Sequence, residues 1–212
     1  MTNILCFGDS NTYGVNTNGG PRLDYDTRWP GALQNLLGRD FKVYENGLDG
    51  RTTVYDDPTV KYRNGMDSVP YAYRTTYPLD IIVIMLGTND TKFVCMGDSA
   101  LNARNVAYGA EMIIKEFKAE AMRFGQKVPQ FILVAPPLIG YKSTFIRFTK
   151  EGSETSRFFS EKFAIAAKNQ KATFVDAAPL CETGPDCLHI TENSHRRLAQ
   201  AIAKAVKDLA LN

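Results

Sequence analysis

The 212-residue chain has no long hydrophobic segment, no strong charge bias and few cysteines or histidines. Its longest apolar run, Ile81–Leu86, is far shorter than the roughly 20 residues of a membrane-spanning helix, so we expect no membrane span. A formal net charge of +2 without a basic patch argues against a nucleic-acid partner. The N-terminus leads directly into an apolar segment and has no signal-peptide pattern, which predicts a cytoplasmic protein.

The cysteines and histidines do not form a metal-binding pattern. The four cysteines, Cys6, Cys95, Cys181 and Cys187, show no Cys-x-x-Cys spacing, and the two histidines are not arranged as in a zinc site. We therefore predict no metal and reduced thiols. A disulfide between Cys181 and Cys187 is the alternative, and it would require an oxidising compartment.

Composition favours one globular domain. Hydrophobic residues make up 44% of the chain and charged residues 23%, as in ordinary globular proteins. The length is generous for one domain and short for two, and we find no repeat or linker. We predict a single domain over residues 1–212.

Short apolar segments alternate with helical patterns along the chain. Parallel strands need long crossover connections, so this alternation predicts an α/β fold whose parallel sheet is covered by helices on both faces. The predicted strands are Ile4–Phe7, Phe41–Tyr44, Asp80–Leu86, Gln130–Ala135 and Ala172–Val175. The predicted helices are Pro30–Gly38, Met66–Thr76, Ala100–Phe124, Ser153–Lys168 and Thr191–Leu209, and residues 138–150 remain unassigned.

Residues 54–78 are rich in tyrosine. Three prolines interrupt the segment, which carries Tyr55, Tyr62, Tyr71, Tyr73 and Tyr77. These rings could line a pocket or an interface, or pack half-buried as tyrosines commonly do, and the sequence favours the second interpretation.

Polar residues follow the predicted strands. Ser10 comes after the first strand, Gly50 after the second, Asn89 after the third, and Asp186 and His189 after the fifth. These turns share one edge of a parallel sheet, where such folds keep their sites. A serine hydroxyl needs a base such as histidine, and a carboxylate orients that base, so the set suits acyl transfer.

Each of these residues also has a purely structural interpretation. Ser10 could cap a helix while Asp9 forms a turn, Asn89 could be a turn residue, and an Asp186–His189 pair could start the last helix. The second histidine, His195, stands beside two arginines, and we expect it on the exposed side of the final helix. His189 is therefore the predicted base.

Four ordered segments resemble the conserved blocks of the SGNH (GDSL-like) hydrolases. They are Gly8-Asp9-Ser10, Asn46–Gly50, Gly87–Asp90 and Asp186–His189. The resemblance implies a three-layer α/β/α sandwich with a five-stranded parallel sheet of the flavodoxin-like type. It also implies no metal or organic cofactor.

The resemblance assigns catalytic roles to five residues. Ser10 is implied as the nucleophile, His189 as the base and Asp186 as its partner. Ser10, Gly50 and Asn89 are implied to form the oxyanion hole, which holds the negative charge that develops on the substrate oxygen. The expected partner is a small-molecule ester.

Within that family the chain is most similar to the arylesterase and acyltransferase branch. The similar stretches include Ile4–Ser10, Arg28-Trp29, Arg51–Thr53, Asp56–Thr59 and Ile84–Lys92. This likeness implies a serine esterase of small acetyl-type or aryl esters, with acyl transfer to alcohols as a further activity and a homo-oligomer as its assembly.

Three other functions remain open. The same triad would serve a carbohydrate O-acetylesterase or an acyl-thioesterase, and a non-catalytic binding module could keep the fold. A nucleotide-binding domain is disfavoured because no Gly-x-Gly-x-x-Gly or Walker-type loop follows the first strand. Asn11 stands where leucine is common in that branch, and Tyr13 stands where the branch can carry tryptophan, which leaves substrate choice open.

Overall fold

A five-stranded parallel sheet forms the centre of the molecule, with the strand order β2-β1-β3-β4-β5. The computed structural model describes residues 1–92, 98–145 and 147–210. The strands are β1 (Thr2–Gly8), β2 (Phe41–Gly47), β3 (Ile81–Met85), β4 (Gln130–Ala135) and β5 (Thr173–Asp176). All five predicted strands are confirmed. The central strand β3 is buried throughout between two helical layers, whereas β2 at the edge of the sheet is only partly buried.

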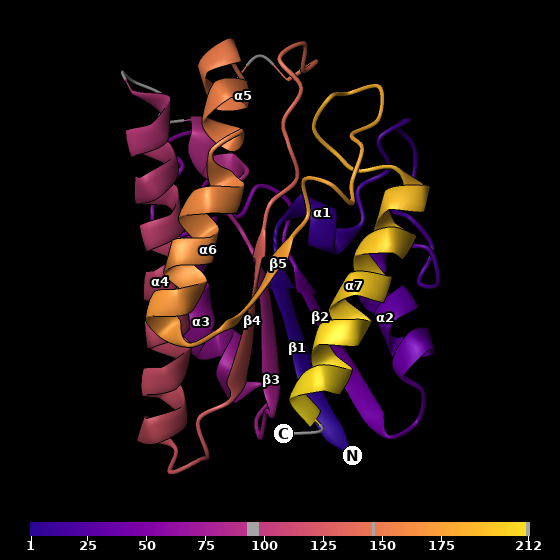
Figure 1. The fold of residues 1–212 in the computed structure, drawn as a ribbon, viewed down its shortest axis with the longest axis vertical. Helices are drawn as coiled ribbons and strands as arrows, with labels where there is room; N and C mark the ends of the chain where they lie inside the picture. The colour runs from indigo at the N-terminus through magenta and orange to yellow at the C-terminus, as the bar shows by residue number, and fades with distance from the viewer. Residues whose placement is uncertain (93–97, 146, 211–212) are drawn as a thin grey trace.

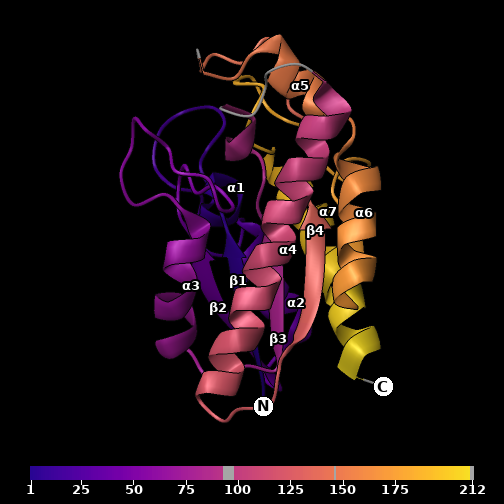
Figure 2. The same cartoon turned by 90° about the vertical axis from the view of Figure 1, so that its left-hand side faces the viewer.

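Helices cover both faces of the sheet (Figure 1). They are α1 (Ser10–Tyr13), α2 (Trp29–Leu37), α3 (Gly65–Arg74), α4 (Ser99–Arg123), α5 (Lys150–Ser156), α6 (Phe159–Gln170) and α7 (Glu192–Ala210), with a 3-10 helix η1 (Asn89–Lys92) after β3. Helices α2 and α7 pack on one face, and α3, α4 and α6 cover the other, which faces the viewer in Figure 2. The predicted three-layer sandwich is confirmed.

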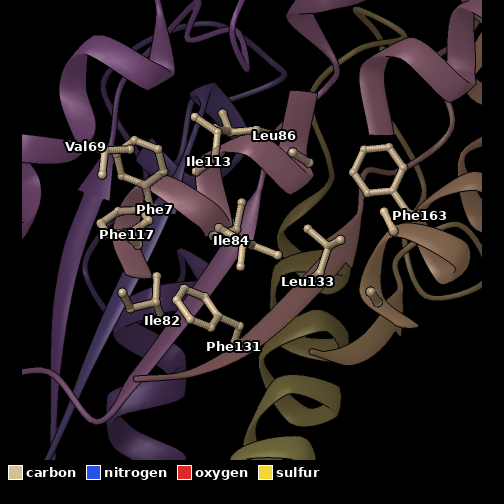
Figure 3. Packing of buried hydrophobic residues seen from close by; sticks show 14 of the residues in the cluster. Phe7, Val69, Ile82, Ile84, Leu86, Ile113, Phe117, Phe131, Leu133 and Phe163 are labelled. Atoms are coloured by element: carbon tan, nitrogen blue, oxygen red, sulfur yellow. The ribbon is translucent and has the colours of Figure 1, made fainter. Parts of the chain in front are cut away.

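Alternate residues of each strand enter two separate cores. On β3, Ile82 and Ile84 pack with Phe117 of α4 and Phe163 of α6 in the larger core (Figure 3). Ile81 and its alternates face α2 and α7 in the smaller core. This period-two division is what a sheet with helices on both faces requires.

The helix predicted at Ser153–Lys168 is instead two helices, α5 and α6. In α5, Ser153 Oγ donates to the Ile139 carbonyl at 2.6 Å, and Ser156 Oγ accepts from the Ile139 N–H at 3.1 Å. In α6, Phe159 and Phe163 are buried in the larger core against the sheet. The helix is interrupted between α5 and α6 because α5 hydrogen-bonds to the loop at Ile139, whereas α6 packs on the sheet.

The last helix buries a histidine that the sequence placed at the surface. His195 is fully buried in α7, so that expectation is wrong. Its side chain lies on the same helical face as buried Leu198 and Ile202, three and seven residues later, while Arg196 and Arg197 point outward. The helical period, rather than the neighbouring charges, determines the orientation of His195.

The described cysteines Cys6, Cys181 and Cys187 are free thiols, whereas the prediction for Cys95 falls outside the described residues. Within residues 1–92, 98–145 and 147–210, no helix is both long and apolar enough to span a membrane.

Candidate active site

Ser10 opens a one-turn helix directly after the first strand. Asp9 caps that helix, because its side chain accepts a 3.0 Å hydrogen bond from the N–H of Asn11. A side chain at Gly8 would collide with Thr12 and the Met85 carbonyl, so the turn requires glycine there. Burial raises the pKa of Asp9 to about 6. The turn therefore fixes Ser10, which is 2% exposed, at the carboxyl end of β1.

Asp186 and His189 form a hydrogen-bonded pair in the loop before α7. Asp186 Oδ2 lies 2.7 Å from His189 Nδ1, and Asp186 Oδ1 accepts the N–H groups of Leu188 at 2.9 Å and His189 at 2.8 Å. Burial raises the pKa of Asp186, but the hydrogen bonds from the His189 ring and these N–H groups outweigh it and lower the pKa. An ionised Asp186 holds a proton on Nδ1 and leaves Nε2 as the basic nitrogen.

Asn89 is hydrogen-bonded to Arg51, the residue that follows Gly50. Gly50 has φ +78°, a left-handed conformation that glycine adopts without strain. Asn89 Nδ2 donates a 3.1 Å hydrogen bond to the Arg51 carbonyl. The Arg51 guanidinium in turn donates to the Gly8 carbonyl at 2.8 Å and to the Asn46 carbonyl at 2.6 Å. Arg51 thus ties the carboxyl ends of β1 and β2 to the loop that carries Gly50.

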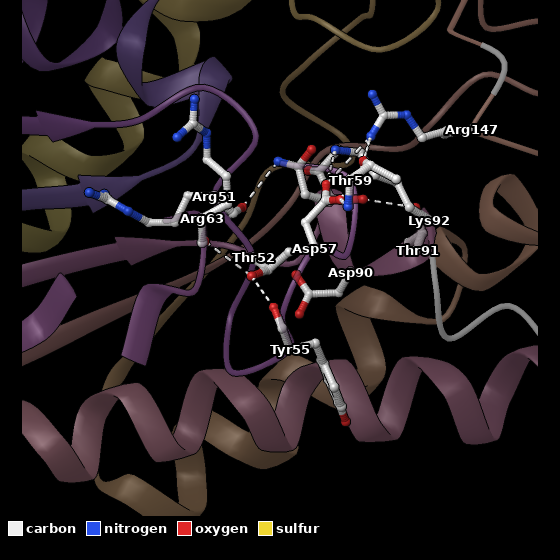
Figure 4. A network of polar contacts seen from close by, with 12 residues as sticks. Arg51, Thr52, Tyr55, Asp57, Thr59, Arg63, Asp90, Thr91, Lys92 and Arg147 are labelled. Carbon is white, nitrogen blue, oxygen red and sulfur yellow. Dashed lines mark hydrogen bonds and ion pairs between the residues drawn. The ribbon is translucent and has the colours of Figure 1, made fainter. Parts of the chain in front are cut away.

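Asp90, the residue after Asn89, anchors the loop that carries Gly50. Buried Asp90 accepts the Thr53 N–H at 3.0 Å and also the Thr53 hydroxyl. Burial raises the pKa of Asp90 to about 6. Figure 4 shows Asp90 beside Thr52 and Tyr55, below the cluster around Asp57. These contacts fix the loop that follows β2 against the loop that follows β3.

A cavity of about 490 Å³ brings the predicted residues together. Ser10, Gly50, Asn89 and His189 all line it, and Asp186 lies behind His189. The other lining residues are Val15, Asp49, Asp57, Val60, Arg63, Lys92, Thr144, Phe145, Arg147, Phe148 and Leu188. The cavity therefore joins a hydroxyl, an imidazole and candidate oxyanion donors in one space.

Described residues of the segment 138–150, for which the sequence predicts no helix or strand, supply part of the wall. Phe145 meets the His189 ring edge to face, with centroids 5.7 Å apart, and Phe148 also lines the cavity. None of the five tyrosines of residues 54–78 lines it. Tyr73 is buried in the larger core, while Tyr62 and Tyr71 are 87% and 73% exposed. The aromatic wall is thus phenylalanine.

Within the part of the chain that the structure describes, no group of three or more histidine, cysteine, aspartate or glutamate side chains is placed to hold a metal ion.

A family model described as GDSL-like lipase/acylhydrolase matches residues 4–202. The chain belongs to this family. The SGNH (GDSL-like) resemblance is therefore confirmed, and the chain is a carboxylic ester hydrolase.

Solved structures of GDSL-like esterases share the whole fold. The aryl esterase of M. smegmatis is 33% identical, with 99% of this chain and 100% of that one covered and a TM-score of 0.88. Est24, a carbohydrate acetylesterase from Sinorhizobium meliloti, gives the same identity, coverage and TM-score. A carbohydrate acetylesterase family member from Sinorhizobium meliloti is 30% identical, with 98% of each chain covered and a TM-score of 0.82. A comparison with curated protein sequences finds no match.

Proposed function

We propose that this GDSL-like hydrolase is a serine esterase of small acyl esters, with Ser10 as nucleophile, His189 as base and Asp186 as its orienting partner. One observation carries the proposal: Ser10 and His189 line the same cavity as Gly50 and Asn89. These are the groups that acyl transfer needs, and they come from four separate segments of the chain.

The reaction begins at the Ser10 hydroxyl. His189 takes the hydroxyl proton on Nε2 while the serine oxygen attacks the ester carbonyl carbon. Asp186, 2.7 Å from Nδ1, stabilises the imidazolium that results. The tetrahedral intermediate collapses, the alcohol leaves with the proton from His189, and the acyl group stays on Ser10. Water, deprotonated by His189, then releases the acid.

Three donors are assigned to the oxyanion. They are the N–H groups of Ser10 and Gly50 and the side-chain amide of Asn89. That amide uses one hydrogen for the Arg51 carbonyl, which orients it and leaves the second hydrogen available. Donors held in place before the reaction stabilise the transition state without reorganisation.

Acyl transfer is a further proposed activity. Phenylalanines 145 and 148 and Leu188 make part of the cavity wall apolar, and such a wall can hold an alcohol next to the acyl-enzyme. Added alcohol should then divert the acyl group from acid to a new ester. A product ratio that never departs from plain hydrolysis would remove this activity from the proposal.

Carbohydrate O-acetylesterase activity is the second candidate. Two of the similar solved structures are described as carbohydrate acetylesterases, and polar residues such as Asp49 and Thr144 also line the cavity. A panel of acetylated sugars, aryl acetates and acyl-CoA, compared by kcat/KM, would separate these activities from thioesterase activity.

Two further expectations remain predictions. The resemblance implies a homo-oligomer, which sedimentation equilibrium would test. Residues 1–212 are assigned to one domain, which predicts a single unfolding transition in calorimetry.

The proposed function is tested by p-nitrophenyl acetate hydrolysis across pH, with the wild type and Ser10→Ala. We expect a wild-type rate that rises with pH as the catalytic base loses its proton, and a variant slower by several orders of magnitude. Equal and appreciable rates would exclude Ser10 as the nucleophile. If both proteins are inert toward aryl esters, the panel above decides the proposal.

A further inference from the structure

The proposed active-site cavity carries more positive than negative side chains. Arg63, Lys92 and Arg147 line it, against the two carboxylates of Asp49 and Asp57. A neutral ester such as an aryl acetate offers no partner for this excess charge. The inference below rests on the proposed function, because it concerns the substrate of the same cavity.

Two of the cations share one carboxylate oxygen. Lys92 Nζ and Arg147 Nη1 each lie 3.6 Å from Asp57 Oδ2 (Figure 4). That separation is longer than a hydrogen bond. The other oxygen, Oδ1, is already occupied, because it accepts the Thr59 N–H at 2.9 Å and the Thr59 hydroxyl at 2.6 Å. One carboxylate oxygen therefore stands between two cations and hydrogen-bonds to neither.

Lys92 is poorly compensated for its position. Its side chain is 9% exposed, and among the described residues Asp57 is its one ion-pair partner. Burial lowers the pKa of Lys92. Phe148, whose ring centroid lies 5.3 Å from Nζ, makes a cation–π contact with the ammonium group. An ammonium with three donors and one distant, shared acceptor gains strongly from a second anion.

Arg63 adds to the positive potential from the loop beside Gly50. Its side chain lies close to Gly50, because a Cβ on that glycine would come within 3.4 Å of Arg63 Nε. No carboxylate of the described residues forms an ion pair with Arg63. Lys92 lies on the same short helix as Asn89, and Arg63 lies beside Gly50. These two cations therefore attract an anionic substrate toward both proposed oxyanion donors.

We propose that the cavity selects esters whose acyl or alcohol part carries a carboxylate or a phosphate, bound between Lys92 and Arg147. Arg147 Nη1 already donates to the Thr59 hydroxyl, but neither cation reaches a carboxylate at hydrogen-bond distance. The substrate anion supplies that carboxylate or phosphate oxygen and places the ester carbonyl near Ser10. Lys92 is the last residue of the 3-10 helix that begins with Asn89, so one cation of the anion site and one proposed oxyanion donor belong to the same short helix. Binding energy from the anion then serves to orient the reacting ester.

The test uses pairs of esters that differ in charge. Mono-p-nitrophenyl glutarate against p-nitrophenyl valerate places the charge on the acyl side, and para-acetoxybenzoate against its methyl ester places it on the alcohol side. Para-acetoxyphenyl phosphate distinguishes phosphate from carboxylate recognition. The readout is the ratio of kcat/KM for the anionic ester to that for the neutral one, each divided by its uncatalysed rate.

We expect the wild-type ratio to exceed one by tenfold or more for at least one pair, and to fall as salt is added. Lys92→Met and Arg147→Gln each lower that ratio by about tenfold. Asp57→Asn raises it, because the neutral amide no longer competes with the substrate anion. A purely structural role would move all three variants in the same direction. The exposed Arg196 on α7 provides the matched control, and Arg196→Gln leaves the ratio unchanged.

A wild-type ratio near one for every pair, or a ratio that none of the three variants changes, overturns this inference. Hydrolysis of the neutral esters would then still support the proposed function. If neither these esters nor the acetylated sugars and acyl-CoA of the earlier panel are hydrolysed, the proposed function fails, and calorimetry with para-hydroxybenzoate still tests the anion site. Binding that Lys92→Met abolishes supports the site, and binding that is absent or unchanged excludes it.

Discussion

Asn11, the neighbour of Ser10, accepts a 3.0 Å hydrogen bond from the backbone N–H of Ile190, the neighbour of His189, although 179 residues separate them. Both residues are buried. The bond joins the turn after β1 directly to the loop before α7. The two halves of the proposed triad are therefore held together by a polar contact as well as by the sheet.

Asn11→Ala should weaken both stability and catalysis. The change leaves the Ile190 N–H buried without a partner, and the free energy of unfolding should fall by about 1–3 kcal/mol. We expect kcat for p-nitrophenyl acetate to drop at least about tenfold with little change in KM, since the histidine loop loses its anchor. Chemical denaturation and steady-state kinetics measure the two effects.

Asn35 provides the matched control for Asn11. It is exposed, and its side chain donates to Asp26 at 2.8 Å. Asn35→Ala should change stability by less than about 0.5 kcal/mol and leave kcat unaltered. An Asn11→Ala protein as stable and active as this control would show that the long-range bond does not position the site.

Asp186→Asn should separate orientation of the base from folding. An asparagine oxygen still accepts the N–H groups of Leu188 and His189, so the loop keeps its shape. The amide holds the imidazole in the wrong tautomer, and we expect kcat to fall by roughly 10⁴. Asp176→Asn, which alters a backbone cap at Ala178 outside the cavity, is the control. A loss of less than tenfold in Asp186→Asn would contradict the assigned role.

Asn89→Ala should lower kcat by about 10²–10³ with KM nearly unchanged, as loss of one oxyanion donor does. The reason is that the donor acts on the charge of the transition state rather than on the bound ester. Asn105→Ala, on α4 and outside the active-site cavity, should have no such effect. A rise in KM at constant kcat would instead assign Asn89 to ground-state binding.

His195 should make the protein sensitive to acid. Burial lowers its pKa to about 3, so the folded chain leaves it neutral while the unfolded chain protonates it below its ordinary value of 6.5. Titration of His195 therefore does not lower the free energy of unfolding above pH 6.5. Below that pH the free energy of unfolding falls until the pH reaches about 3, by at most roughly 5 kcal/mol. Asp9 and Asp90, with pKa values raised to about 6, change stability in the opposite sense, since they favour the folded state at lower pH.

His195→Gln isolates that effect. In the wild type His195 Nδ1 accepts a hydrogen bond from the backbone N–H of Trp29 at 3.2 Å, and a glutamine oxygen can accept the same backbone N–H. Denaturation at a series of pH values should show a shallower loss of stability between pH 6.5 and 3 than in the wild type. Identical slopes in the two proteins would mean that His195 does not titrate on unfolding.

The sequence was most informative where apolar periodicity and polar strand ends coincide. Ile81–Leu86 and Gly87–Asp90 together predicted a buried central strand and the turn that carries Asn89, and the structure places both there. The same reasoning brought Ser10, Gly50 and His189 to one edge of the sheet, and they line one cavity. Parallel strands end on the same side, so the topology brings the loops that carry these residues to one edge, and the Asn11–Ile190 hydrogen bond holds the His189 loop there.

Side-chain partners that lie far apart in sequence could not be predicted. Nothing local to Asn11 indicates its bond to Ile190, and nothing local to Asp57 indicates that it meets Lys92 and Arg147. The break between α5 and α6 has no proline or glycine signal, because it arises from contacts with Ile139 and with the sheet. His195 was misplaced for a different reason, since its charged neighbours were given more weight than its helical period.

The most direct test of the proposed mechanism is covalent labelling with a p-nitrophenyl phosphonate, followed by peptide mass spectrometry. We predict one phosphonyl group per chain, attached to Ser10, with loss of esterase activity in proportion to labelling and no label on Ser10→Ala. A label on another residue, or full labelling of Ser10 with activity retained, would contradict the assignment of Ser10 as the nucleophile.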